Sequence, residues 1–395
     1  MYHSFFLLLP CFTCFFWCIT FLFMWKTSFR SRKIWIGTSF VMGISTFIWG
    51  YFFEGVQNYA LFYKLEVLEA FTTLLLLPLL YFAFKSLTSE QPFNWKDYLW
   101  FLPAPLITVS LIVIYTYMGE EQAVAYITEI VENRGTLNEL ADPIFVIHHM
   151  VSVYLYKVLV FAQIIILLVY ATLRLVRYRH RLADFFSTLE NKSMEHQYAL
   201  LVGLYLILFL SLLTYRGRFY YGGNVLFAQI SMLVWAVILY FMGYHLSRMD
   251  YTADNLASDL VQADREANEA GYGELTDTNE QNNVLKTLLP LFNQIIDEEQ
   301  VFLQNNLRLD DVARVMRTNR TYISRLINEE FQCNFSDFIN MKRIEYAQEF
   351  MRMNPDMTQE QVAAQSGFSH PSSFSRTFKR LTGTTFREWQ RKNLR

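Results

Sequence analysis

Two short runs of polar and cationic residues lie near the C-terminal end of the chain. Their hydroxyl, amide, imidazole, guanidinium and ammonium groups can contact base edges and phosphates. The candidate DNA-binding residues are Asn319, Arg320, Thr321, Ser324 and Arg325 in the first run, and Ser369, His370, Ser372, Ser373, Arg376 and Lys379 in the second. Phosphate neutralisation by the cations would set the affinity and its salt dependence. For any single charged residue, an exposed salt bridge is the alternative interpretation.

Helical periodicity predicts that each run begins the second helix of a helix-turn-helix unit. Leu309, Val312, Ala313 and Met316 share one face of a helix, and Asn319 is a good N-cap for the helix that follows. The unit then repeats, with Thr358 expected to cap one helix, Gly367 to make the turn and Ser369 to cap the next helix. Three aromatic residues of these helices have the spacing of a buried stripe and are expected in the core: Tyr322, Phe374 and Phe378.

A long helix is predicted between the two units, over residues 335–353. Asn354-Pro355 ends it, because the residue before a proline is disfavoured in helical angles. A last short helix is expected at about 385–393. The two caps stand fifty residues apart with a rigid helix between them, so the two recognition helices could enter successive major grooves, about 34 Å apart.

The second unit resembles a known family of DNA-binding proteins. The run VAAQSGFSHPSSFSRTFKRLTG, from Val362 to Gly383, is closely similar to the second helix-turn-helix signature of the AraC-type (arabinose-regulator) transcription factors. Positions that match this signature are Ala363, Gly367, Phe368, Ser373, Phe374, Phe378, Lys379 and Gly383. Positions that fit the first unit and the linking helix of the family are Leu309, Ala313, Tyr322, Ser324, Arg325, Leu326, Phe335, Arg343 and Ala347.

The resemblance covers about 100 residues and implies a bacterial transcriptional regulator that binds double-stranded DNA, with RNA polymerase as a further partner if it activates transcription. Two positions depart from the family pattern. Gln332 stands where the family usually has glycine, and Phe386 where it usually has proline. Both changes affect local turn geometry and remove no side chain that would read a groove.

The N-terminal part of the chain is apolar and predicts a membrane domain. Seven stretches are each long enough to cross a hydrocarbon core of about 30 Å, at about 4–25, 34–53, 65–84, 98–118, 150–173, 198–215 and 224–246. The first is expected to be a retained span, because positive charges follow it and none precedes it. The predicted fold class is therefore all-α: a seven-span transmembrane helix bundle followed by a soluble helical domain with two helix-turn-helix units.

Basic residues are distributed unevenly between the two sides of these spans. The loops 26–33, 85–97 and 174–197 carry eleven Lys and Arg residues, whereas the opposite loops carry four. Because cytoplasmic loops are enriched in Lys and Arg, the first set is predicted to be cytoplasmic. The chain would then be a multi-pass protein of the cytoplasmic (inner) membrane, in contact with lipid, with its N-terminus outside and its DNA-binding domain in the cytoplasm.

Charge divides the predicted domains: residues 1–246 form the membrane domain, 247–283 an acidic linker helix and 284–395 the DNA-binding domain. The linker has nine acidic and two basic residues. Leu256, Leu260, Ala263 and Ala267 share one of its faces, which could pair with a second copy in a homodimer. A flexible joint is expected at Gly271 and Gly273. The linker is too short to hold a phosphotransfer module, so mechanical signalling through it is expected.

Polar residues at membrane depth are candidates for ligand binding or sensing. They are Glu66, Glu69, His148, His149, Lys157, Gln163 and Gln229. Interfacial positions with snorkelling side chains are the alternative. The long loop at about 119–149 is acidic and contains a predicted short surface helix over 123–133. It could take part in sensing or act only as a solvated connector.

Several functions are not favoured by the sequence. It contains no paired catalytic carboxylates, no His-Glu metal motif and no phosphate-binding loop, so we expect no enzyme activity, no cofactor and no metal. Cys11, Cys14 and Cys18 would share a helix face and are interpreted as packing residues. The favoured hypothesis is a membrane receptor that regulates transcription in response to an unknown ligand. The alternatives are a transporter or channel with a regulatory DNA-binding appendage, and a constitutively tethered transcription factor.

Overall fold

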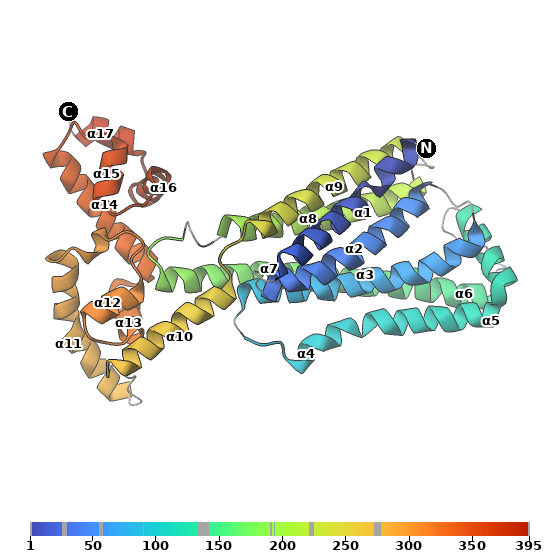
Figure 1. Ribbon diagram of the computed structural model, residues 1–395, viewed down its shortest axis with the longest axis horizontal. Helices are drawn as coiled ribbons and strands as arrows, with labels where there is room; N and C mark the ends of the chain where they lie inside the picture. Colours follow the sequence, from blue (N-terminus) through green and yellow to red (C-terminus); the bar gives the residue numbers. More distant parts are fainter. Residues whose placement is uncertain are drawn as a thin grey trace. The chain divides into compact units, whose positions relative to one another are not determined.

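The computed structural model describes residues 2–25, 30–54, 58–89, 91–132, 142–189, 192, 194–220, 225–271 and 278–393. Within these ranges the chain is helical and contains no β-strand (Figure 1). It divides into two compact units: Met1–Leu175 with Glu195–Asp254, and Val176–Met194 with Asn255–Arg395. The C-terminal end of one long helix therefore belongs to the second unit, together with the DNA-binding segment. The predicted all-α fold is confirmed.

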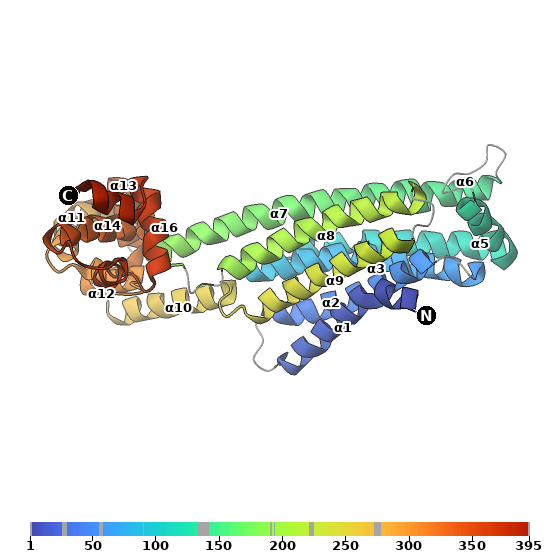
Figure 2. The ribbon, with the colours of Figure 1, turned by 90° about the horizontal axis from the view of Figure 1, so that it is seen from above.

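Long apolar helices make up the first unit and run alongside one another (Figure 2). They are α1 (Tyr2–Phe23), α2 (Arg30–Glu54), α3 (Tyr59–Thr88), α5 (Pro103–Glu132), α7 (Tyr156–Phe185), α8 (Met194–Tyr220) and α9 (Val225–Ser247). Four short elements connect them: α4 (Trp95–Tyr98), η2 (Leu99–Phe101), α6 (Pro143–His149) and a π-helical turn, η3 (Met150–Leu155). Among the described residues, seven segments are long and apolar enough to cross a membrane, as the sequence predicted.

The interior of the first unit is packed by aromatic and aliphatic side chains. Phe21 of α1 and Leu87 of α3 are each 1 % exposed, and Leu200 of α8 is fully buried beside them in the same cluster. Gly243 of α9 permits a close approach, because a Cβ there would lie 2.3 Å from the Trp17 ring of α1. Cys11, Cys14 and Cys18 are free and buried on one face of α1, in agreement with a packing role.

A break divides α5 at Gly119, whose φ of 71° lies in the left-handed region. Beyond the break the chain is helical through Glu132, which confirms a helix in the predicted 123–133 region. Its Tyr126 and Ile127 sides are buried in the first unit. The loop residues 133–141 lie outside the described residues.

In the described residues after α9, the second unit has nine elements. They are α10 (Ala253–Glu269), α11 (Thr278–Asp297), η4 (Val301–Leu303), α12 (Leu309–Val315), α13 (Arg320–Phe331), α14 (Phe335–Met353), α15 (Gln359–Gln365), α16 (Pro371–Thr382) and α17 (Phe386–Asn393). The bounds of α14 match the predicted 335–353 helix, and Asn354 is its C-cap. Gly271 has a φ of 83°, as a turn there requires, whereas Gly273 lies outside the described residues.

The apolar face predicted for the linker is partly buried within a single chain. In α10, Leu256 is 1 % exposed and Ala263 is 6 % exposed, whereas Leu260 and Ala267 are half-buried. Pairing of two copies through this face stays a prediction.

Candidate nucleic-acid interface

The first helix-turn-helix unit consists of α12 and α13. Asn319 is the N-cap of α13 and its side-chain oxygen accepts a hydrogen bond from the Thr321 N–H, as predicted. The turn passes through Arg317, which has a φ of 51°. Tyr322 and Leu326 face the core, so the opposite side of α13 is the one that can contact a ligand.

The candidate residues of the first unit do not share one environment. Asn319 is 6 % exposed and serves as a cap, whereas Thr321 is exposed. Ser324 is half-buried, and Arg325 pairs with Glu329 one turn later at 2.5 Å. Arg320, the first residue of α13, is bound by a carboxylate of α10.

The second unit consists of α15 and α16. Thr358 caps α15 in a capping box with Gln361, as expected for its N-terminus. Gly367 makes the turn at a φ of +77°. The predicted cap of α16 was wrong: His370 is the N-cap, and Ser369 lies one residue earlier, near the Asn306 side chain. Pro371 explains the shift, because it favours the first helical position and extends the residue before it.

The two faces of α16 have opposite character. Phe374 and Phe378 are fully buried in a cluster with Phe386, so their predicted core position is confirmed. His370 and Ser372 are exposed at the start of the helix, and Ser369 and Ser373 are half-buried. Arg376 and Lys379 are exposed farther along.

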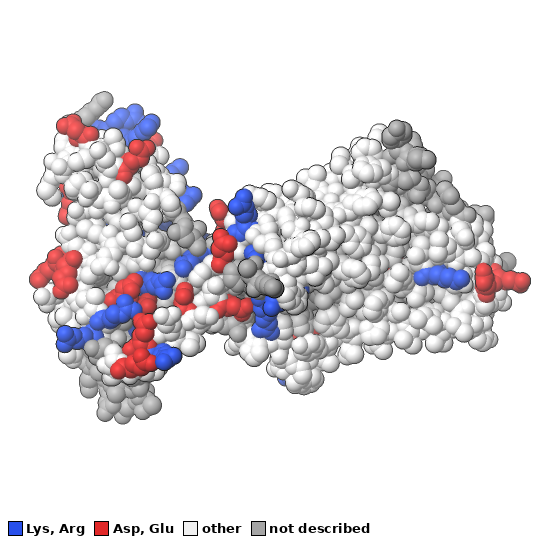
Figure 3. Space-filling model, viewed as in Figure 1, with Lys and Arg blue, Asp and Glu red and all other residues white. Residues whose placement is uncertain are grey.

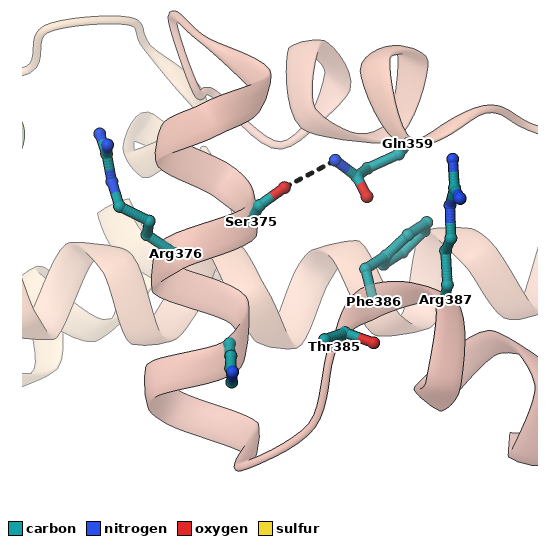
Figure 4. Close-up of a pocket in the computed structure, with 7 residues that line it drawn as sticks. Gln359, Ser375, Arg376, Thr385, Phe386 and Arg387 are labelled. Atoms are coloured by element: carbon teal, nitrogen blue, oxygen red, sulfur yellow. Dashed lines mark hydrogen bonds between the residues drawn. The ribbon is translucent and has the colours of Figure 1, made fainter.

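A cleft of about 400 Å³ lies beside α16 (Figure 4). Arg376, Lys379 and Arg387 line it together with Gln359, whose amide donates to the Ser375 hydroxyl at 2.6 Å. Arg387 belongs to α17 and was not among the sequence candidates. The sequence shows Arg387 only as a basic residue of the last helix. Periodicity does not indicate which helix packs beside α16, so this residue could not be assigned to the cleft. In Figure 4 the Arg376 side chain extends from α16 to the side opposite Gln359 and Arg387. Exposed cations on this surface suit a polyanion such as a phosphate backbone.

The linking helix α14 holds the two units through a buried arginine. The Arg343 guanidinium is fully buried and donates to the carbonyl oxygens of Phe302 and Gln304, each at 2.6 Å. Burial lowers the pKa of Arg343 to about 10. The same guanidinium lies 5.6 Å from the Phe368 ring. A single side chain therefore contacts both the segment before α12 and the turn between α15 and α16.

Comparison with known proteins places residues 312–392 in a family described as "Helix-turn-helix domain", of the AraC type. The C-terminal segment is an AraC-type helix-turn-helix domain. A Staphylococcus aureus (strain MSSA476) protein described as an uncharacterized HTH-type transcriptional regulator is 30% identical over 98 residues, which cover 25% of this chain and 13% of the relative. The uncharacterized transcriptional regulatory protein YesN of Bacillus subtilis (strain 168) is 34% identical over 89 residues, or 22% of this chain and 24% of the relative.

The family match covers residues 312–392, and each of these relatives matches about a quarter of the chain. The chain spans only 13% of the length of the Staphylococcus aureus relatives, and no solved structure matches. Within the domain, the two departures from the family pattern are local. Gln332 ends α13 in the left-handed conformation, at a φ of 54°, and Phe386 begins α17.

The membrane-domain candidates form a second polar grouping, separate from the AraC-type domain. Glu66 accepts a hydrogen bond from the Tyr115 hydroxyl, and Glu69 accepts one from Tyr156 at 3.1 Å. We refer to these side chains and their polar and aromatic neighbours as the Glu–Tyr–His cluster. Its members are Glu66, Glu69, Tyr115, Tyr126, His148, His149 and Tyr156.

His148 lies at the centre of the Glu–Tyr–His cluster and is fully buried. Its ring lies 4.5 Å from the Tyr115 ring and 4.4 Å from the Tyr126 ring, and the Tyr126 hydroxyl is 3.4 Å from Nδ1 of His149. Lys157 is half-buried two residues after the π-helical turn.

Two other membrane candidates lie elsewhere. Gln163 donates to the Trp100 carbonyl oxygen at 3.2 Å. Gln229 lies on α9, which packs mainly against α1. The structure therefore links Glu66 with the two histidines through Tyr115 and Tyr126, places Glu69 with Tyr156, and leaves Gln229 on a different helix pair.

Proposed function

We propose that the chain is a membrane-bound, one-component transcriptional regulator that binds double-stranded DNA through α13 and α16. The character of α16 carries the proposal: its aromatic stripe is buried, and its exposed side presents Arg376 and Lys379 beside a cleft. Both side chains are exposed, and exposed cations on a helix surface can neutralise phosphates.

Within this proposal the candidate residues have two kinds of role. His370, Ser372 and Ser373, near the start of α16, read base edges, as do Thr321 and Ser324 on α13. The cations contribute mainly phosphate contacts: Arg320, Arg325, Arg376, Lys379 and, in addition, Arg387. The burial of Asn319 favours a capping role that orients α13.

Mapping of bound chromatin sites tests DNA binding directly. Arg376→Ala should weaken occupancy at all sites by about tenfold, which corresponds to about 1.4 kcal/mol. Arg352→Ala is the matched control, because Arg352 is an exposed arginine of α14 that does not line the cleft. Unchanged occupancy in Arg376→Ala would show that α16 is not a recognition helix.

A membrane location is supported by the apolar character of the first unit. Its seven long apolar helices and its largely uncharged surface in Figure 3 suit a hydrocarbon environment. The excess of Lys and Arg in the loops 26–33, 85–97 and 174–197 supports a cytoplasmic side that also holds the AraC-type domain.

The Glu–Tyr–His cluster is the candidate for signal reception in the membrane domain. Buried polar groups at membrane depth are costly and mark functional sites. If the domain senses a signal there, Glu66→Gln should change target-gene output in response to conditions, while the basal level of protein in the membrane stays the same. The half-buried Gln229, replaced by Leu, is a control on another helix pair. A soluble 247–395 fragment with the same output as the full chain under all conditions would exclude sensing and favour a plain tether.

A further inference from the structure

The linker helix α10 is strongly acidic, and two of its carboxylates bind arginines of the first helix-turn-helix unit. The helix carries five acidic residues and one arginine, Arg265. Asp264 accepts two hydrogen bonds from Arg320, from Nε at 2.9 Å and from Nη2 at 3.0 Å. Glu266 accepts one from Nη2 of Arg314 at 2.9 Å. A two-point arginine–carboxylate contact is stronger and more specific in geometry than a single one.

A second segment reaches the same arginine from another direction. The strap, residues 185–188, follows the end of α7 and belongs to the same compact unit as α10 and α13. The Phe185 ring lies 5.7 Å from the Arg320 guanidinium. Between Asp264 and Phe185, the Arg320 side chain is only 22% exposed.

The backbone of the strap is bonded to the segment just before α12 and to the linking helix α14. The Ser187 N–H donates to the Leu307 carbonyl oxygen at 3.0 Å. The Ser187 carbonyl accepts from the Ser336 hydroxyl at 3.0 Å and from the Asn340 amide at 3.2 Å. Ser187 is fully buried, so these bonds are shielded from water and hold Phe185 in place.

The position of Arg320 decides what this contact does. Arg320 is the first residue of the recognition helix α13, where the helix dipole and the free N–H groups attract anions. Asp264 therefore occupies a position that suits a DNA phosphate, and it uses the two donors that a phosphate would need. The other acidic groups of α10 would also repel an approaching phosphate backbone.

The second unit has a different arrangement. The ion pair of α16 is internal to the AraC-type domain, where Arg380 binds Asp337 of α14 at 2.7 Å. The acidic contacts from α10 described above fall on Arg314 and Arg320 of the first unit. The acidic linker helix therefore contacts the recognition helix α13 through Arg320, whereas the ion pair of α16 is formed within the AraC-type domain.

We propose that α10 is an internal competitor of DNA, which covers Arg320 and Arg314 with carboxylates and keeps α13 from the major groove until α10 is released. This inference rests on the proposed DNA binding and adds the means of its regulation. Helix α10 thus occupies the surface around Arg314 and Arg320, and its carboxylates take the place of DNA phosphates.

The test measures DNA affinity with the full chain in lipid nanodiscs. The probe is a duplex of about 40 base pairs, long enough for two half-sites, recovered by the full chain from a random-sequence library. The double variant Asp264→Asn with Glu266→Gln should bind it about three- to tenfold more tightly than the wild-type chain, because two partly exposed ion pairs that oppose binding are removed. Asp264→Ala with Glu266→Gln should give at least the same gain.

Glu269→Gln is the matched control. It removes the same charge from the same helix, but Glu269 pairs with Arg265 of α10 itself and not with α13. Its gain in affinity should stay below about twofold. Equal gains in Glu269→Gln and in the double variant would reduce the effect to net charge and overturn the proposed competition.

Two further variants separate this inference from DNA binding itself. In an Arg320→Ala background, the gain from the double variant should fall to less than half, because the masked side chain is absent. Arg376→Ala with Lys379→Ala should weaken binding in every background. If that cleft variant bound DNA normally, the proposed function would fail. If it lost binding while the double variant gained none, DNA binding would stand and only the competition would be rejected.

Discussion

The two helix-turn-helix units place different residues at equivalent backbone positions. Each unit needs a left-handed residue in its turn and another at the end of its recognition helix. In the second unit these are Gly367 and Gly383, with φ of +77° and +75°. In the first unit they are Arg317 and Gln332, with φ of 51° and 54°. Because the left-handed region costs a non-glycine residue about 1–2 kcal/mol, the first unit is locally less favourable.

The cores and caps of the two units also differ, but not in one direction, because Asn319 caps α13 whereas α16 has no side-chain cap. The second unit is closed by an aromatic cluster, and Thr358 gives α15 a capping box. The residue at the start of α12 is Arg308, whose side chain has no hydrogen-bond acceptor to cap the helix. Its guanidinium lies 5.6 Å from the Phe186 ring of the strap instead. Each unit thus relies on a distant segment, the first on the strap at Arg308 and the second on Leu303 at the Gly367 turn.

The largest expected effect concerns the turn of the second unit. Gly367→Ala should destabilise it by about 3 kcal/mol, because a Cβ there would lie 2.7 Å from the Leu303 carbonyl oxygen in a left-handed residue. Hydrogen exchange of the α15 and α16 amides in the full chain measures the loss. Gly383→Ala is the control: its Cβ would meet no atom within 4 Å, so it should cost only about 1 kcal/mol. Equal costs would contradict the steric argument.

The first unit should respond in the opposite sense to glycine. Gln332→Gly should stabilise α13 and α14 by about 1 kcal/mol, because it removes the strain of a left-handed glutamine. Slower hydrogen exchange of the α13 amides would show this. Glu330→Gly, two residues earlier in the helix, should instead destabilise by about 1 kcal/mol. A loss of stability in both variants would mean that Gln332 is not strained.

Local signals explain which features were predicted from the sequence. The bounds of α14 followed from its periodicity and from Asn354-Pro355, and the seven apolar helices followed from their length. The cap of α16 was assigned to Ser369, because a good capping residue was given more weight than the effect of Pro371 on the residue before it.

Contacts between distant segments left no such signal. The strap touches residues more than a hundred positions later, and Asp264 is 56 positions from Arg320. Neither hydrophobic periodicity nor helix propensity predicts which residues so far apart in the sequence come into contact. In the same way, the grouping of Glu66 with Tyr115 depends on how two helices pack, although the polar residue itself stands out within an apolar span.

Local capping of the second unit gives a smaller effect. Thr358→Ala should cost about 1 kcal/mol, because the Gln361 N–H loses its side-chain acceptor at the start of α15. Thr358→Ser keeps the acceptor and should change the stability by less than half as much. Hydrogen exchange at the first turn of α15 distinguishes the two variants. The same cost in both would place the effect in the methyl group and not in the cap.

The smallest expected effect is a pH dependence of the docking of the strap, caused by Lys192. Its ammonium lies 3.6 Å from the centre of the Phe186 ring. Burial lowers the pKa of Lys192 to about 8, with Asp259 acting against the shift and Arg308 adding to it. A docked lysine that favours its neutral form binds fewer protons than a released one between pH 8 and its ordinary pKa of about 10.5. Docking should therefore strengthen as the pH rises through that window, and be nearly constant below it.

Hydrogen exchange at the Ser187 amide, corrected for the intrinsic effect of pH on exchange, should then show greater protection at pH 9.5 than at pH 7.5. The gain should be under about 1 kcal/mol, since solvent screens a partly exposed group. Lys192→Met carries no titrating group at this position, so its protection should be independent of pH over the same range. The second helix-turn-helix unit supplies an internal reference through the Phe368 amide, which is bonded to the Ala363 carbonyl oxygen of its own unit. An equal rise in protection at the Ser187 and Phe368 amides would mean that the pH affects the stability of the whole chain. The result would then contradict a local effect of Lys192 on the docking of the strap.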